Sequence, residues 1–355
     1  MDTNIDINEL RENIANLVDK ASEREIPLYE VRSVFKTTKA GLSARNFDGL
    51  KNKLNSEFDI SKLNELAKSM QDLVVSHIDF DDKLISIFKD IPNISDLYDK
   101  LTDVFSSDTD MATEPTNYCI YTRKDLSPYQ TVFQFVVSRE ISVRKTLSPD
   151  DLREDMSEEF QEVIGIKKTP LDCHDFIMID TKENLVIIGI DLALILGRNE
   201  LSVAQHNFHN FLRRTLGIVL SNEVDLFPKI QEFYDFPIDK SNGVTEIYFM
   251  TPAGTAHHET LKGHGKDLRE ATYHRKGTEG VRNEKSNGKL LHNDITPYRI
   301  STRFYRESDT PIIDISLKSS YLAINTNNGS HLYDAYIYGS RSKVDLDFIL
   351  DKLII

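Results

Sequence analysis

The spacing of apolar residues changes near residue 110, and this change constrains the fold of the 355-residue chain more than any other feature of its sequence. Before it, apolar residues recur at the spacing that is typical of amphipathic helices. After it, short runs rich in aromatic and β-branched residues, such as 118–122 and 131–137, indicate strands. The later strands and helices do not alternate regularly, so the pattern predicts an α+β fold with a mixed, mainly antiparallel sheet.

A small, polar and acidic stretch, SSDTDMATEPTN, separates the two regions and is typical of a linker. We therefore expect a helical domain over residues 1–106, a linker over 107–117 and an α+β domain over 118–355. Within the last of these, residues 257–306 have little apolar content before Leu290 and are expected to form a long, exposed and mobile basic loop between strands.

The clearest helix covers residues 60–78, where apolar side chains from Leu63 to Ile78 form one stripe. The clearest strands, 176–180 and 185–191, are joined by the polar turn TKEN and predict a hairpin. The other expected helices cover 82–91, 95–105, 149–162, 201–216, 226–234 and 344–354, and the other expected strands cover 246–250, 298–305, 312–317, 321–324 and 331–338.

Three features of the sequence bear on the cellular compartment in which the protein is expected. The segment MDTNIDINELREN has no basic start and no apolar stretch, so we expect no signal peptide. The longest apolar run, Leu185 to Gly197, is interrupted by Asp191 and is shorter than the roughly 20 residues that a membrane-spanning helix needs. Two cysteines, Cys119 and Cys173, are too few for a disulfide framework. We expect a cytoplasmic protein without a membrane span.

Charge is distributed unevenly along the chain. The formal net charge is −14 at pH 7, yet residues 257–306 contain 11 lysines and arginines against 6 aspartates and glutamates. The remaining residues contain 32 basic and 51 acidic side chains. A local excess of positive charge in an acidic chain is evidence about what the protein binds and not about its fold. It indicates an anionic partner.

The basic loop has the residue types that nucleic-acid binding requires. Lysine and arginine neutralise phosphates, and the glycines between them allow close approach of the backbone. Tyr273 and Tyr298 are interleaved with the cations and suit stacking on unpaired bases. A solvated loop whose charge balances the acidic remainder is the alternative. The candidate nucleic-acid-binding residues of the loop are Lys262, Lys266, Arg269, Arg275, Lys276, Arg282, Lys285 and Lys289.

Two further candidate residues follow on the strand expected at 298–305. Alternation along a strand places Arg299 and Arg303 on one face. Two arginines on one strand face are suited to binding a phosphate. They could equally pair with Glu307 or Asp314.

A second group of polar residues lies on the helix expected at 201–216. Helical spacing places His206, His209 and Arg213 on the side opposite the apolar stripe, and we include all three among the candidate nucleic-acid-binding residues. Two histidines at this spacing can also bind a metal, but no third ligand has convincing spacing. A solvated helix face is the simplest alternative.

No motif of a nucleotide-hydrolase phosphate loop, a dinucleotide-binding fold or a serine nucleophile is present. A metal-dependent nuclease remains an alternative, because Asp172 or Asp175 precedes the triplet Asp180-Thr181-Lys182. Thr181 and Lys182 fall in the expected hairpin turn, where polar residues are common. The loop histidines lack the spacing of known metal sites, so we predict neither a metal nor a cofactor.

The order of elements from Tyr118 to Leu216 resembles the DNA-binding subunits of bacterial anti-phage systems such as Kiwa. The shared outline is a strand ending near Arg139, the hairpin DFIMIDTKENLVIIGID and a following helix, and it covers under a third of the chain. The resemblance implies DNA binding and a role in antiviral defence.

The leading interpretation is a nucleic-acid-associated protein that contacts the phosphate backbone through residues 257–306. One alternative is a protein–protein interaction subunit of a larger assembly that docks through the helices of residues 1–106. The other is a metal-dependent nuclease or hydrolase. The sequence leaves open whether the chain is catalytic and whether it forms an oligomer.

Overall fold

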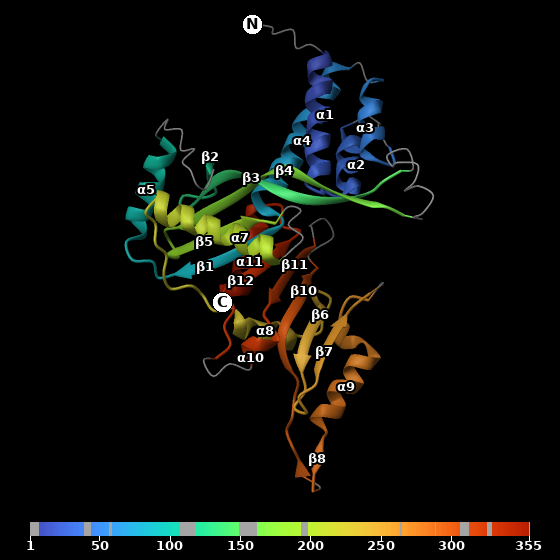
Figure 1. Cartoon of the computed structure of the whole chain (residues 1–355), viewed down its shortest axis with the longest axis vertical. Helices are drawn as coiled ribbons and strands as arrows, with labels where there is room; N and C mark the ends of the chain where they lie inside the picture. Colours follow the sequence, from blue (N-terminus) through green and yellow to red (C-terminus); the bar gives the residue numbers. More distant parts are fainter. Residues whose placement is uncertain are drawn as a thin grey trace.

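The computed structural model describes residues 7–38, 44–56, 59–106, 118–148, 162–192, 198–262, 265–287, 289–305, 312–324 and 329–354. A helical region at the N-terminus is followed by one large antiparallel sheet with helices packed on it (Figure 1). The α+β fold expected from the sequence is therefore confirmed.

The N-terminal helices form a bundle with its own apolar core. Asn46 and Asp59 begin two of them: their side chains accept hydrogen bonds from the N–H groups of Gly49 (2.8 Å) and Ser61 (3.0 Å). Apolar side chains at helical spacing are buried between the helices, and the helix predicted over 60–78 is confirmed. The bundle consists of α1 (Ile7–Glu23), α2 (Leu28–Thr37), α3 (Phe47–Leu54) and α4 (Ile60–Phe80).

Residues 82–91, expected as a helix, instead contain a strand, β1 (Lys83–Lys89). It pairs antiparallel with β5 (Leu185–Asp191) and β12 (Asp334–Tyr338), so it lies in the middle of the sheet. The helix prediction is wrong because a strand buried on both faces is a nearly continuous apolar run, which periodicity does not distinguish from a buried helix. The helix expected at 95–105 is confirmed as α5 (Ile94–Ser106).

Strand β1 is part of the sheet, and α5 packs on it. The apolar core of the bundle ends at Ile78, whereas Leu84 and Leu101 belong to a core on the sheet. The linker expected at 107–117 lies outside the described residues. The division of the chain at residue 106 stays a prediction, and within the described residues the bundle gives way to the sheet between α4 and β1.

Ten strands of the described residues form the sheet in the order β2-β3-β4-β5-β1-β12-β11-β10-β6-β7, and all neighbouring pairs are antiparallel. The expected hairpin is confirmed as β4 and β5, in which Phe176 pairs with Gly189 and Asp180 with Leu185. The other strands are β2 (Cys119–Asp125), β3 (Gln130–Thr146), β4 (Ile164–Asp180), β6 (Asn242–Met250), β7 (Ala256–Thr260), β10 (Thr296–Phe304) and β11 (Ile313–Lys318).

Three helices after the hairpin are as expected: α7 (Arg198–Asn210), α8 (Phe227–Asp235) and α11 (Lys343–Ile354). Residues 321–324 form the short helix α10, so the strand expected there is wrong; a four-residue apolar run has no readable period. The strand expected at 331–338 is confirmed only from Asp334. Residues 149–161 of the helix expected at 149–162 lie outside the described residues.

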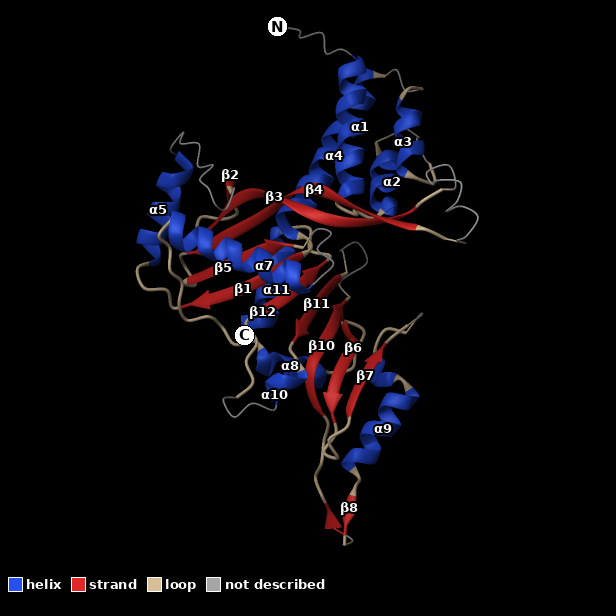
Figure 2. Ribbon diagram, viewed as in Figure 1, coloured by secondary structure: helices blue, strands red, loops and turns tan. Residues whose placement is uncertain are grey.

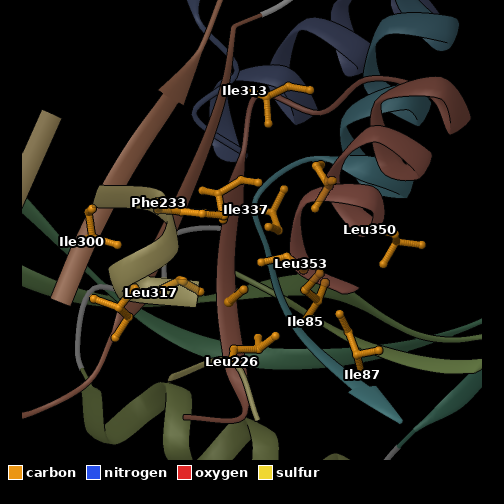
Figure 3. Close-up of a cluster of buried hydrophobic side chains, with 14 of the residues drawn as sticks. Ile85, Ile87, Leu226, Phe233, Ile300, Ile313, Leu317, Ile337, Leu350 and Leu353 are labelled. Carbon is orange, nitrogen blue, oxygen red and sulfur yellow. The ribbon is translucent and has the colours of Figure 1, made fainter. Parts of the chain in front are cut away.

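The sheet has an apolar core on each face. The first face packs against α8 and α11, and Figure 3 shows Ile85 and Ile337 of the sheet beside Leu353 of α11. The second face packs against α5 and α7, with α7 continuing into a π-helical turn over Phe211–Thr215 (Figure 2). The second core contains no buried residue of β11, β10, β6 or β7. That end of the second face carries polar and charged side chains instead.

Ion pairs connect the bundle to the segment before α11. Glu30 of α2 lies 3.1 Å from His77 Nε2 and accepts a hydrogen bond from Arg341 Nη2 at 3.0 Å. Asp81 pairs with His77 Nδ1 at 3.2 Å and also with Arg341. Glu30 and Arg341 are 311 positions apart in the chain, and the contacts of Arg341 with Glu30 and Asp81 hold the bundle against the sheet.

Replacing Glu30 with glutamine is expected to lower the free energy of unfolding at neutral pH by about 2–3 kcal/mol. Burial alone would raise the pKa of Glu30, but its contacts with His77 and Arg341 lower this pKa to about 2. A carboxylate of this kind stabilises the fold above its unfolded-state pKa, and the contribution disappears as the pH falls through about 2. Urea unfolding of both proteins from pH 7 to pH 2 should show their difference shrinking in acid; a constant difference would contradict this assignment.

Candidate nucleic-acid interface

The basic region expected to be one long loop is folded along much of its length, which corrects that expectation. It contains β7, a short 3-10 helix (Leu268–Glu270), α9 (Thr272–Arg282) and strand β10. Between α9 and β10 lies a small hairpin of β8 (Lys285–Ser286) and β9 (Lys289–Leu290). Figure 1 shows α9 beside β7 and the hairpin at the end of the molecule opposite the N-terminus.

Two buried side chains one turn apart fix the orientation of α9. His274 Nδ1 lies 2.9 Å from Glu259 of β7, and its Nε2 lies 3.0 Å from the Tyr234 hydroxyl of α8. Thr278 is buried four residues later. Because this side of the helix faces the sheet, the neighbouring positions Arg275 and Lys276 point away from it and are exposed.

We call residues 272–292, which comprise α9 and the hairpin, the basic arm. Two glutamates accompany the five lysines and arginines of this segment. Within the described residues, Arg282 is the one of these five cations that forms an ion pair, with both carboxylate oxygens of Asp294 at 3.1 and 3.0 Å. The four exposed cations of the arm that have no ion pair in the described part of the chain are Arg275, Lys276, Lys285 and Lys289.

The other loop candidates lie at the base of the arm and differ in exposure. Lys262 and Lys266 are exposed, and Lys266 Nζ lies 5.0 Å from the ring centroid of Tyr305. Arg269 is buried: it pairs with Asp267 at 2.6 Å and donates hydrogen bonds to three other groups of the fold. The expectation that Arg269 contacts a phosphate is therefore corrected, because its guanidinium is already satisfied inside the protein.

The two arginines of β10 lie on one face of the strand, as alternation predicted. Arg303 makes a bidentate pair with Asp314 of β11, with both distances at 2.8 Å, so the alternative of pairing with Asp314 holds for this residue. Arg299 lies 3.6 Å from Glu246, and its Cζ is 4.6 Å from the ring centroid of Tyr248. Glu307, the other acidic candidate, lies outside the described residues.

Arg299 and Arg303 belong to the end of the second sheet face that lacks an apolar core. We call the second-face side chains of β7, β6, β10, β11 and β12 the open sheet face. An antiparallel sheet commonly leaves one face partly to solvent. On β11 the half-buried Asp314 and Lys318 lie on this face together with the buried Ser316, whereas the three buried apolar residues lie on the other face. Sequence reasoning missed most of this surface, although the apolar alternation at 313, 315 and 317 already assigns Lys318 to the polar side. Its described members include Glu246, Tyr248, His258, Arg299, Ser301, Arg303, Asp314, Ser316, Lys318 and Tyr336.

The structure does not bring the polar candidate residues of α7 and the turn that follows it together with the basic arm. His206 and Arg213 are exposed and His209 is half-buried, on a helix that packs on the second face. Burial lowers the pKa of His209, against the opposing effect of Asp334. The arm packs beside β6 and β7 on the first face, where the His274 ring lies 6.0 Å from that of Phe249. The two groups of candidates therefore form separate surfaces.

Two aspartates of the nuclease pattern have structural roles. Asp175 is fully buried, accepts a hydrogen bond from the Tyr118 hydroxyl at 2.6 Å and pairs with Arg139. Asp180 accepts hydrogen bonds from the N–H groups of Lys182 (3.0 Å) and Glu183 (2.9 Å) in the turn between β4 and β5. In the part of the chain that the structure describes, no three His, Cys, Asp or Glu side chains are grouped so as to hold a metal ion.

No protein-family model matches the chain, and no curated protein sequence matches it. Among the described helices, none combines the length and the apolar character needed to cross a membrane.

Proposed function

We propose that the protein binds nucleic acid in the cytoplasm through the phosphate backbone, using the basic arm together with Lys262 and Lys266 at its base. The observation that carries this proposal is the group of four exposed arm cations without an ion pair in the described residues. Such cations on an acidic chain favour a polyanion, because each phosphate contact releases counterions. The resemblance of residues 118–216 to DNA-binding subunits of anti-phage systems supports a role in antiviral defence.

The test is charge reversal of three cations, Lys266→Glu, Arg275→Glu and Lys276→Glu, in one variant. Binding to labelled single- and double-stranded DNA and RNA is expected to weaken by about tenfold or more at low salt. The slope of log affinity against log salt should fall by up to about three, since each lost phosphate contact removes about 0.9. Fluorescence anisotropy across a salt series measures both quantities.

A matched control reverses three exposed lysines of the bundle, Lys36, Lys53 and Lys68, and changes the net charge by the same amount. If the arm is the binding surface, this control should keep most of the wild-type affinity and its salt slope. Equal losses in the two variants would show that net charge alone controls binding. Unchanged binding in the arm variant would overturn the proposal.

Docking of a partner protein through residues 1–106 stays a prediction, and the structure changes how it is tested. Deleting those residues would remove β1 from the middle of the sheet, so loss of partner capture could reflect unfolding. Substitutions of exposed side chains on α1 to α4 leave the sheet intact and are the better test.

A further inference from the structure

Two cations face each other on the open sheet face. Arg299 of β10 and Lys318 of β11 are directly paired in the strand register. Like charges at such positions repel each other and cost stability unless something compensates them. Glu246 lies 3.6 Å from Arg299, but no ion pair to Lys318 is present among the described residues. The pair thus carries more positive charge than its protein surroundings neutralise.

Aromatic rings hold both cations in place. Lys318 Nζ lies 3.8 Å from the ring centroid of Tyr336. Arg299 lies over Tyr248, whose ring stacks on His258 with centroids 3.9 Å apart. Contacts of this kind fix the position of a cation without neutralising it. The side chains are therefore oriented in advance for an anion, which lowers the entropy cost of binding one.

We propose that Arg299 and Lys318 together bind a phosphate group on the open sheet face. Arginine offers planar, paired donors to a phosphate, and lysine adds a compact point charge. The buried hydroxyl groups of Ser301 and Ser316 lie in the neighbouring row of the same face, where Ser316 donates a hydrogen bond to Ser301 (2.8 Å) and Ser301 donates one to Glu246 (3.3 Å), so the donors for the phosphate are those of Arg299 and Lys318. The source of the phosphate is a nucleic-acid strand or a free nucleotide; only the first of these rests on the proposed function.

The protonation of Lys318 gives this site a measurable property. Burial and the neighbouring Arg299 lower the pKa of Lys318 to about 8, against the opposing effect of Glu246. A bound phosphate would stabilise the charged ammonium, so binding is expected to weaken as the pH rises from 7 to 9. Other titratable or charged groups also face this region. They are His258 of β7, Tyr248 of β6, Arg303 of β10 with its partner Asp314 of β11, and Tyr336 and Tyr338 of β12.

The experiment compares wild type with two substitutions, Lys318→Gln and Lys318→Arg, using two probes. Adenosine monophosphate is titrated by calorimetry, and a fluorescein-labelled 20-residue thymidine oligonucleotide is titrated by anisotropy. At pH 7, Lys318→Gln should bind at least one probe about tenfold more weakly, whereas Lys318→Arg should bind it nearly as well as wild type. From pH 7 to pH 9, wild-type affinity should fall several-fold and that of Lys318→Arg should not. Thermal unfolding checks that both variants fold.

Each outcome is decisive. A loss confined to adenosine monophosphate identifies a free nucleotide as the source of the phosphate, and a loss on the oligonucleotide identifies a strand. The proposal is overturned if wild type binds neither probe, or if Lys318→Gln binds both as wild type does. The charge-reversed arm variant separates the two proposals: if it keeps oligonucleotide affinity while Lys318→Gln loses it, the arm fails and this site stands.

Discussion

Replacing Asp191 with alanine is expected to lower the free energy of unfolding by about 3–5 kcal/mol, because it leaves two buried cations without their counter-charge. The carboxylate of Asp191 accepts hydrogen bonds from Arg24 Nη2 at 3.0 and 2.9 Å and lies 3.3 Å from Lys83 Nζ. It also accepts the backbone N–H of His174 at 2.7 Å. Burial alone would raise the pKa of Asp191, but Lys83 and Arg24 hold it well below its usual range.

Urea unfolding at pH 7 measures the effect. The control is Asp99→Ala, which removes an exposed carboxylate of α5 and should change the free energy of unfolding by no more than about 0.5 kcal/mol. Asp191→Asn keeps the shape of the side chain and an acceptor for His174 N–H, so it should destabilise the protein less than alanine does. A loss below about 1 kcal/mol for Asp191→Ala would show that the buried cations find other partners or water.

This carboxylate also explains how the bundle is attached to the sheet. Arg24 follows the end of α1, whereas Asp191 is the last residue of β5 and Lys83 the first residue of β1. One buried anion therefore joins three elements from two parts of the chain. Together with the pair of Glu30 and Arg341, it makes the bundle and the sheet depend on each other for stability.

The elements predicted well from the sequence are those fixed by local pattern. The helix Ile60–Phe80 has a polar cap and a sustained apolar stripe, and the hairpin of β4 and β5 has a polar turn between two β-branched runs. Strand β1 could not be predicted in this way, because its partners lie about 100 and 250 residues later in the chain. Asp191 is visible in the sequence as a charge within an apolar run, but nothing local indicates Arg24 as its partner.

The candidate site was predictable to a similar degree. Charge counting located the region that forms the basic arm, and alternation placed Arg299 and Arg303 on one strand face. Charge counting could not separate a cation that points to solvent from one that holds the fold together. It also missed Lys318, because this residue lies on a strand outside the basic region and reaches Arg299 only through sheet pairing.

Replacing Arg269 with alanine is expected to lower the free energy of unfolding by about 3 kcal/mol or more. The exposed cations near it in the sequence should, by contrast, be replaceable without loss of stability. The guanidinium of Arg269 donates hydrogen bonds to the carbonyl oxygens of Tyr234 (2.7 Å) and Phe236 (2.5 Å), which cap the end of α8. It also neutralises Asp267, which is 4% exposed. Alanine would leave two carbonyls without this donor and the buried carboxylate of Asp267 without its counter-charge, although Asp267 would still accept the backbone N–H of residue 269.

The matched substitution is Arg275→Ala, six residues later on the exposed side of α9. It should leave the free energy of unfolding within about 0.5 kcal/mol of wild type and weaken binding to a labelled oligonucleotide severalfold at low salt. Arg269→Ala should show the opposite pattern: a large loss in urea unfolding, with oligonucleotide affinity preserved under conditions where the variant is folded. If both substitutions reduced affinity equally without loss of stability, Arg269 would have to reach the nucleic acid. For that, the Arg269 side chain would have to leave its buried position, because in the structure its guanidinium donates hydrogen bonds to groups inside the protein.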